Sequence, residues 1–182
     1  MRLPILAAAA LGLAALALPA CEEGPASTII DSRTGDAMQL LRWAATQGPV
    51  LVEIRGEPFA GQARWNPDSL VATVYDAFLP VTNPPMQFTR DKAKAGDPGY
   101  RFVWLIDPGP GFAIDPTCAG QYPPRAATKA DWVEVRAVFC APNKSLVAVQ
   151  GRVRRPKAAD DRLWDRLIRQ MSRQLAGDRF QG

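Results

Sequence analysis

Hydrophobic positions up to residue 106 recur with two different periods, and each period predicts an element. Apolar residues at helical spacing predict helices over residues 36–47 and 67–78, the second of which opens on an Asn-Pro-Asp start. β-Branched residues predict a strand over residues 50–55. Residues 100–106 are apolar at almost every position, which is typical of a central strand covered on both faces. We therefore expect two helices and two strands in this part of the chain.

Weaker patterns lie between and after these elements. Residues 79–82 and 86–89 predict two short strands or one edge strand interrupted by a Pro-Pro pair. Residues 107–125 hold five prolines and three glycines, so we expect a long loop there with no helix. Residues 132–140 and 145–154 flank an Ala-Pro-Asn-Lys turn, which predicts a β-hairpin whose register the turn fixes.

The last helix has the clearest pattern in the chain. It is expected to begin after Asp160 or Asp161 and to end at Gly177. Four arginines fall within an arc of about 60° on this helix, opposite its apolar side chains, and Asp165 beside them can pair with only part of the set. We call these four residues the arginine stripe: Arg162, Arg166, Arg169 and Arg173.

The order of the elements predicts an α+β or mixed α/β fold. We expect one sheet of about 4–5 strands with a C-terminal hairpin, packed by about three helices. The antiparallel hairpin argues against a doubly wound parallel sheet. The chain has 182 residues, 47% of them hydrophobic, which is enough for one sizeable core and short for two. Residues 36–182 are therefore expected to form a single domain.

The N-terminal residues are typical of an export signal rather than of a folded element. Residues 4–18 form an apolar run of 15, too short for a comfortable membrane span, and Leu18-Pro19-Ala20-Cys21 follows at once. This sequence resembles the lipobox of bacterial lipoproteins, and the remaining chain is similar to proteobacterial envelope lipoproteins without an established activity. The resemblance implies a signal peptide over residues 1–20 and a lipid on Cys21. The alternative is an ordinary secretory signal, with Cys21 a plain thiol.

Several expectations depend on this resemblance. Residues 21–35 would form a lipidated cysteine and a flexible tether, which places the domain in the cell envelope, facing the periplasm. Glu22-Glu23, rather than an aspartate after the cysteine, favours the outer membrane over the inner membrane. The N-terminal lipid would then attach the protein to the membrane.

The cysteine count agrees with lipidation of one cysteine. Three cysteines cannot all pair within one chain, so use of Cys21 for lipid leaves Cys118 and Cys140 as a pair. Disulfides persist in exported proteins, and a disulfide between these two residues is therefore expected. Two buried reduced thiols are the alternative.

Composition excludes several kinds of chemistry. The chain has no histidine, so Ser-His-Asp and Cys-His nucleophiles and histidine-ligated metals are excluded. Asp107, Asp115 and Asp131 lack the spacing of a calcium loop, and we expect neither a metal nor a cofactor. The formal net charge of +4 is concentrated near the C-terminus, where eight arginines and one lysine face four aspartates between residues 152 and 179.

These observations favour a non-enzymatic interaction or assembly-support module over an enzyme. The arginine stripe would contact anionic lipid headgroups or an acidic envelope protein, and nucleic acid is not expected in this compartment. A solvated helix face with no partner is the alternative for the stripe. The alternative function is a small-ligand-binding or weak hydrolase domain with a site under the 107–125 loop. Its candidate side chains are Glu53, Glu57 and Asp107 for chemistry and Trp104, Phe112 and Tyr122 for the pocket wall.

Overall fold

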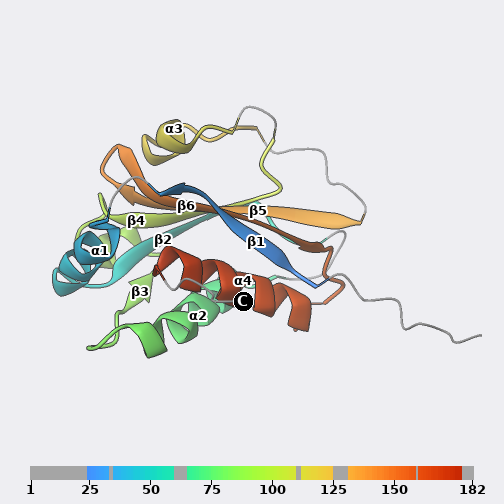
Figure 1. Cartoon of the computed structure of the whole chain (residues 1–182), viewed down its shortest axis with the longest axis horizontal. Coiled ribbons are helices and arrows are strands. Elements are labelled where there is room, and N and C mark those ends of the chain that lie inside the picture. Colours follow the sequence, from blue (N-terminus) through green and yellow to red (C-terminus); the bar gives the residue numbers. More distant parts are fainter. Residues whose placement is uncertain are drawn as a thin grey trace, which may run out of the picture.

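The computed structural model describes residues 24–32, 35–59, 65–109, 112–124, 131–158 and 160–177. Within these residues the fold is mixed α+β, with one open sheet of six strands and four α-helices (Figure 1). The strands are β1 Ala26–Ser32, β2 Val50–Arg55, β3 Phe88–Thr89, β4 Arg101–Ile106, β5 Trp132–Ala141 and β6 Lys144–Arg154. The helices are α1 Ala37–Thr46, α2 Pro67–Phe78, α3 Ile114–Cys118 and α4 Arg162–Leu175, with 3-10 turns at Leu79–Val81 and Lys92–Lys94.

The strand order in the sheet is β1-β6-β5-β4-β2-β3. β2 is parallel to both of its neighbours, whereas β4, β5, β6 and β1 pair in antiparallel fashion. Figure 1 shows α2 and α4 side by side on one face of this sheet and α3 on the other. The two faces are therefore covered unequally: α2 and α4, with Ala37 and Leu41 of α1, pack on one side, and the short helix α3 packs on the other.

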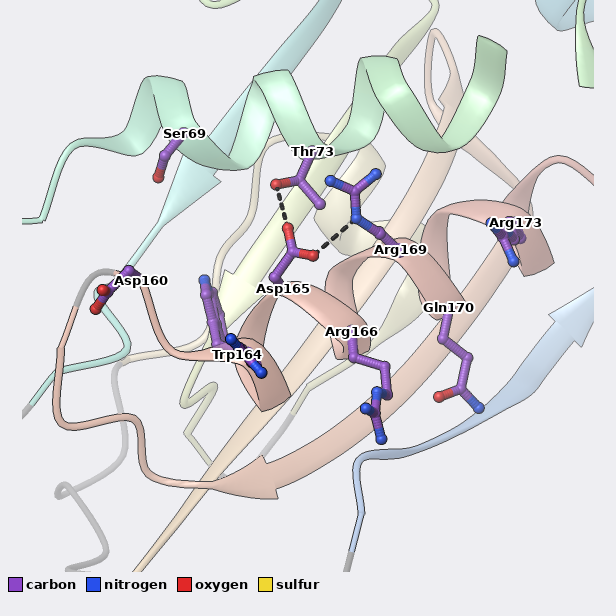
Figure 2. A pocket seen from close by; sticks show the side chains of 10 residues that line it. Ser69, Thr73, Asp160, Trp164, Asp165, Arg166, Arg169, Gln170 and Arg173 are labelled. Carbon is purple, nitrogen blue, oxygen red and sulfur yellow. Dashed lines mark hydrogen bonds and ion pairs between the residues drawn. The ribbon is translucent and has the colours of Figure 1, made fainter. Parts of the chain in front are cut away.

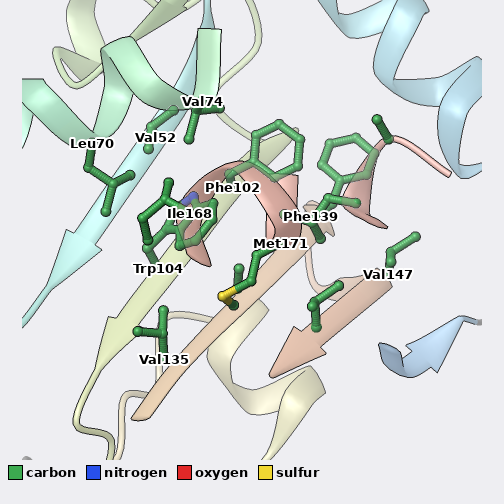
Figure 3. Close-up of a cluster of buried hydrophobic side chains, with 14 of the residues drawn as sticks. Val52, Leu70, Val74, Phe102, Trp104, Val135, Phe139, Val147, Ile168 and Met171 are labelled. Atoms are coloured by element: carbon green, nitrogen blue, oxygen red, sulfur yellow. The ribbon is translucent and has the colours of Figure 1, made fainter. Parts of the chain in front are cut away.

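The main core lies between the sheet and the helix pair α2 and α4. Because successive strand residues point to opposite faces, every second side chain of β4 and β5 enters this core. Figure 3 shows Trp104 and Val135 from these strands in the same cluster as Ile168 and Met171 of α4. Gly151 of β6 has no side chain to place there, and a Cβ on it would lie 2.7 Å from Met171 Sδ. The glycine thus allows α4 to pack close to the sheet.

A smaller core lies on the other face, around a disulfide. Cys118 of α3 and Cys140 of β5 form this disulfide, with their Cα atoms 5.4 Å apart, so the pairing expected from the cysteine count is confirmed. Val103 and Leu105 of β4 pack against it. All six residues of β4 are buried, as expected for a central strand covered on both faces.

Most of the expected elements are confirmed. The strand 50–55 and the helix 67–78 have the expected bounds, and the hairpin, the first helix and the last helix agree to within about two residues. Residues 79–81 form a 3-10 turn instead of a strand, and of residues 86–89 only Phe88–Thr89 form a strand, which pairs with β2. The expected 4–5 strands and three helices are thus too few for the described residues.

Two elements contradict the expectations. The segment expected to be a flexible tether contains β1, which pairs with β6 from Ala26 to Ser32, so the sheet begins before residue 36. The loop 107–125 contains α3, although a proline lies inside it. Pro116 is the third residue of this helix, where the backbone N–H has no partner within the helix, so the ring costs no hydrogen bond.

Candidate functional site: the arginine groove

The arginine stripe is positioned by the way in which α4 begins. The side chain of Asp161 accepts hydrogen bonds from the backbone N–H groups of Leu163 and Trp164, at 2.9 and 3.3 Å, and caps the helix. Trp164 and Leu167 are buried against the sheet, so the opposite side of α4 faces outward. Asp161, and not Asp160, is therefore the residue that caps α4, and the burial of its apolar side chains leaves the arginines at the surface.

A groove of about 820 Å³ runs between this outward side of α4 and the helix α2. Figure 2 shows it from close by, with Ser69 and Thr73 of α2 above the residues of α4. All four arginines of the stripe line this groove, together with Asp160, Trp164, Asp165 and Gln170. We call it the arginine groove.

The floor of the arginine groove is a polar connection between the two helices. Asp165 accepts a hydrogen bond from Thr73 Oγ1 at 3.0 Å and another from Arg169 Nε at 2.7 Å (Figure 2). Arg169 also reaches Asp76 of α2, with Nη2 3.3 Å from the carboxylate oxygen. The hydrogen bond to Asp165 raises the pKa of Arg169, because it stabilises the charged guanidinium. Arg169 therefore holds α4 against α2.

Arg162 and Arg166 differ from Arg169. Both are exposed, and neither makes an ion pair with any residue in the described part of the chain. Figure 2 shows Arg166 pointing away from Asp165, next to Gln170. The stripe thus contains one arginine that ties the helices together and two whose guanidinium groups are available to a ligand. Arg173 is half-buried farther along the helix.

Glu53, one of the three carboxylates expected for chemistry, is held in a separate cluster on the α3 side of the sheet. It accepts a hydrogen bond from the Tyr122 hydroxyl and lies 3.3 Å from Arg101 Nε. The Arg55 guanidinium is stacked 4.6 Å from the centroid of the Tyr122 ring. Burial, followed by the hydrogen bond to Glu53, raises the pKa of Tyr122. Glu53 thus forms an ion pair with Arg101 inside the sheet, and its hydrogen bond from Tyr122 attaches the segment after α3 to the sheet.

Asp107 belongs to a buried ion pair at the end of β4. Its Oδ2 accepts a hydrogen bond from Arg155 Nη2 at 2.8 Å, and its Oδ1 accepts one from the Glu134 backbone N–H at 3.1 Å. Arg155 also donates to the carbonyl oxygens of Pro58 and Trp132, at 2.9 and 2.8 Å. This arrangement connects the ends of β4, β5 and β6 to the segment after β2. Arg155 could not be singled out from the sequence, because it looks like one more charge in a basic run.

The structure does not bring the expected catalytic or pocket residues together. Glu57 is exposed, whereas Glu53 and Asp107 are held by different arginines. Trp104 lies on the opposite face of the sheet from Phe112 and Tyr122, so the three rings do not line one pocket. Alternation along β4 explains this error, because only odd-numbered residues of that strand face α3.

No group of three His, Cys, Asp or Glu side chains among the described residues is arranged to hold a metal ion. The same part of the chain contains no helix long and apolar enough to cross a membrane. Cys21, the lipobox and Glu22-Glu23 lie outside the described residues. Comparison with known protein families finds no family that matches the chain, and comparison with curated proteins finds none that matches it.

Proposed function

We propose that this protein is a lipid-anchored lipoprotein of the cell envelope that faces the periplasm and acts as a non-enzymatic interaction module. In this proposal, Cys21 carries the lipid and the arginine groove binds an acidic segment of another envelope protein. The anchor is supported by the Leu-Pro-Ala-Cys sequence after an apolar run, and by a cysteine count that leaves Cys21 over once Cys118 and Cys140 have paired. The outer membrane is the preferred location because glutamate follows Cys21.

The observation that carries the binding role is the difference between the arginines of the stripe. Asp165 and Arg169 already fix the floor of the groove, so Arg162 and Arg166 are not needed to hold α4 in place. A guanidinium group can bind a carboxylate through two parallel hydrogen bonds, and Gln170 beside Arg166 offers an amide donor. These groups suit a carboxylate ligand in the groove.

The shape of the groove favours a protein segment over a lipid surface. It is a recess between two helices, and Asp160 and Asp165, which also line it, repel anions that do not fit between them. A flat layer of headgroups cannot enter such a recess, whereas an extended or helical acidic segment can place single carboxylates beside Arg162 and Arg166. Alternating repulsion and attraction along an interface gives specificity.

The anchor is tested by changing Cys21 to Ala and by treating cells with globomycin, which blocks lipoprotein signal cleavage. Both treatments should prevent the mature lipidated form, and Cys21→Ala should move the protein from the membrane fraction to the soluble fraction and abolish fatty-acid labelling. An unchanged distribution of the variant, with no labelling of the wild-type protein, would refute the anchor.

The groove is tested with a decaglutamate peptide as a model acidic segment, using the protein without residues 1–21. The affinity should fall with rising salt and should drop at least about tenfold in Arg162→Gln/Arg166→Gln, because two charge-assisted contacts are lost. Lys92→Gln/Lys94→Gln removes the same charge from two exposed residues that do not line the groove and should bind like the wild type. Equal, weak binding by all three proteins would leave the stripe as solvated surface, and binding to anionic vesicles but not to the peptide would favour lipid.

A further inference from the structure

The strand β1 brings the N-terminal part of the chain to one particular end of the sheet. Its first residue, Ala26, pairs with Arg152 near the end of β6, and at the same end Trp132 of β5 pairs with Arg154. β1 then runs to the opposite end, where α1 follows it, and Figure 1 shows α1 at the far end of the molecule from the start of α4. We call the end with Ala26, Trp132 and Arg154 the proximal end.

The link between the proposed lipid and the proximal end is short. Cys21 precedes Ala26 by five residues, and an extended chain spans at most about 3.6 Å per residue. The backbone of Ala26 therefore lies within about 18 Å of the lipidated cysteine. This limit follows from the proposed function, because it applies only if Cys21 carries the lipid. A flexible segment reaching to residue 35 would have left the domain free to turn either end toward the membrane.

The proximal end carries side chains that suit a membrane surface. Arg152 and Arg154 are exposed on the α3 side of β6, since Val153 between them enters the core under α4. The Arg152 guanidinium is stacked 5.6 Å from the centroid of the half-buried Trp132 ring, which leaves its N–H edges available. Neither arginine has an ion-pair partner in the described part of the chain. We call Trp132, Arg152 and Arg154 the proximal patch.

We propose that the proximal patch binds anionic phospholipid headgroups around the lipid anchor and holds the domain with its proximal end toward the bilayer. Arginine binds phosphate through two hydrogen bonds, and a tryptophan ring has an apolar body that sits well at the level of the headgroups. Each basic residue near an anionic surface strengthens binding about fivefold. Asp131 and Asp160 are also exposed at this end, so attraction depends on the local patch and not on net charge. The arginine groove then extends away from the bilayer along α4, toward soluble partners.

The test uses the full-length lipidated protein, reconstituted into phosphatidylcholine vesicles that contain a nitroxide-labelled headgroup lipid. Nitroxide quenches tryptophan fluorescence only at short range. The quenching of Trp132 is measured as the difference between the wild-type protein and Trp132→Phe. The difference between the wild-type protein and Trp43→Phe gives the quenching of Trp43, a half-exposed residue of α1 at the opposite end. Addition of about 30% phosphatidylglycerol should increase quenching of Trp132 at least twofold and leave Trp43 unquenched.

Charge variants complete the test. Arg152→Gln/Arg154→Gln should abolish the increase, Arg152→Lys/Arg154→Lys should keep part of it, and Lys92→Gln/Lys94→Gln at the opposite end should keep all of it. Co-sedimentation with pure phosphatidylcholine vesicles reports the anchor separately, because it needs only the lipid. A protein that does not co-sediment overturns both proposals. A protein that co-sediments but shows no effect of phosphatidylglycerol on Trp132, or quenching of Trp43 instead, overturns the orientation alone.

Discussion

Replacing Asp107 by asparagine should lower the free energy of unfolding by about 3 kcal/mol, because it removes the buried carboxylate that pairs with the buried Arg155 guanidinium. The two side chains are 5% and 6% exposed, so water cannot take over the role of the carboxylate. Removing one partner of a buried ion pair costs about 3–5 kcal/mol. The lower end applies here because the carbonyl oxygens of Pro58 and Trp132 still accept hydrogen bonds from Arg155.

The choice of asparagine isolates the charge. The asparagine side chain keeps an oxygen that can accept the hydrogen bond from the Glu134 N–H, and this residue type tolerates the positive φ of 49° at position 107. Asp107→Ala loses both advantages and should cost about 1–2 kcal/mol more. Arg155→Met removes the other charge, and in Asp107→Asn/Arg155→Met no charge of this pair remains buried. The double variant should therefore be more stable than the sum of the two single effects predicts.

The assay is urea-induced unfolding followed by circular dichroism, with the slope of the transition as a check that the native state is unchanged. An interaction energy of at least about 1 kcal/mol in the double-variant cycle is expected. A loss below about 0.5 kcal/mol in Asp107→Asn, or simple additivity of the two single variants, would refute the view that this ion pair fixes the strand ends.

Three further predictions follow from the two cores and from Tyr122. Cys118→Ala/Cys140→Ala should lose about 3 kcal/mol in urea unfolding, because the disulfide closes a segment with a sequence separation of 22, and reductant should affect only the wild type. Gly151→Ala should lose about 1–3 kcal/mol in the same measurement, since its Cβ meets α4 side chains at 2.7 Å; a neutral effect would contradict the close packing. The raised pKa of Tyr122 contributes stability below pH 10.0 that is lost as pH rises through the folded value, so Tyr122→Phe should unfold with a smaller alkaline decline.

Elements that depend on local patterns could be predicted from the sequence. The helix 67–78 has an asparagine cap and a proline at its first position, and its bounds are as expected. The strand 50–55 has a β-branched residue at every second position, and a glycine follows its last residue. The side of α4 that carries the arginines follows from the 100° rotation per residue, and the structure places all four at one groove.

Features that depend on distant partners could not be predicted in this way. β1 has a polar, mixed sequence, and its strand conformation is stabilised by β6, whose residues lie far along the chain. Arg155 looks like Arg152 and Arg154 in the sequence, and only the position of Asp107 makes it a buried residue. Within the described residues, the arginine stripe contains both ion-paired and unpaired arginines because Thr73 and Asp76 of α2 contact Asp165 and Arg169 of α4. The pattern of α4 alone gives no information about these residues of α2.

The pairing of β1 with β6 also determines when this part of the molecule can fold. β1 leaves the ribosome or a translocation channel well before β6, since the hydrogen bond between Ser145 and Asp31 joins residues 114 positions apart. Until β6 has emerged, β1 remains a single strand with free backbone groups, which other chains can pair with. The segment beside the proposed anchor is therefore made before its partner strand, and its backbone hydrogen bonds can form only after β6 has emerged, so β1 is a segment that a chaperone of the emerging protein would protect.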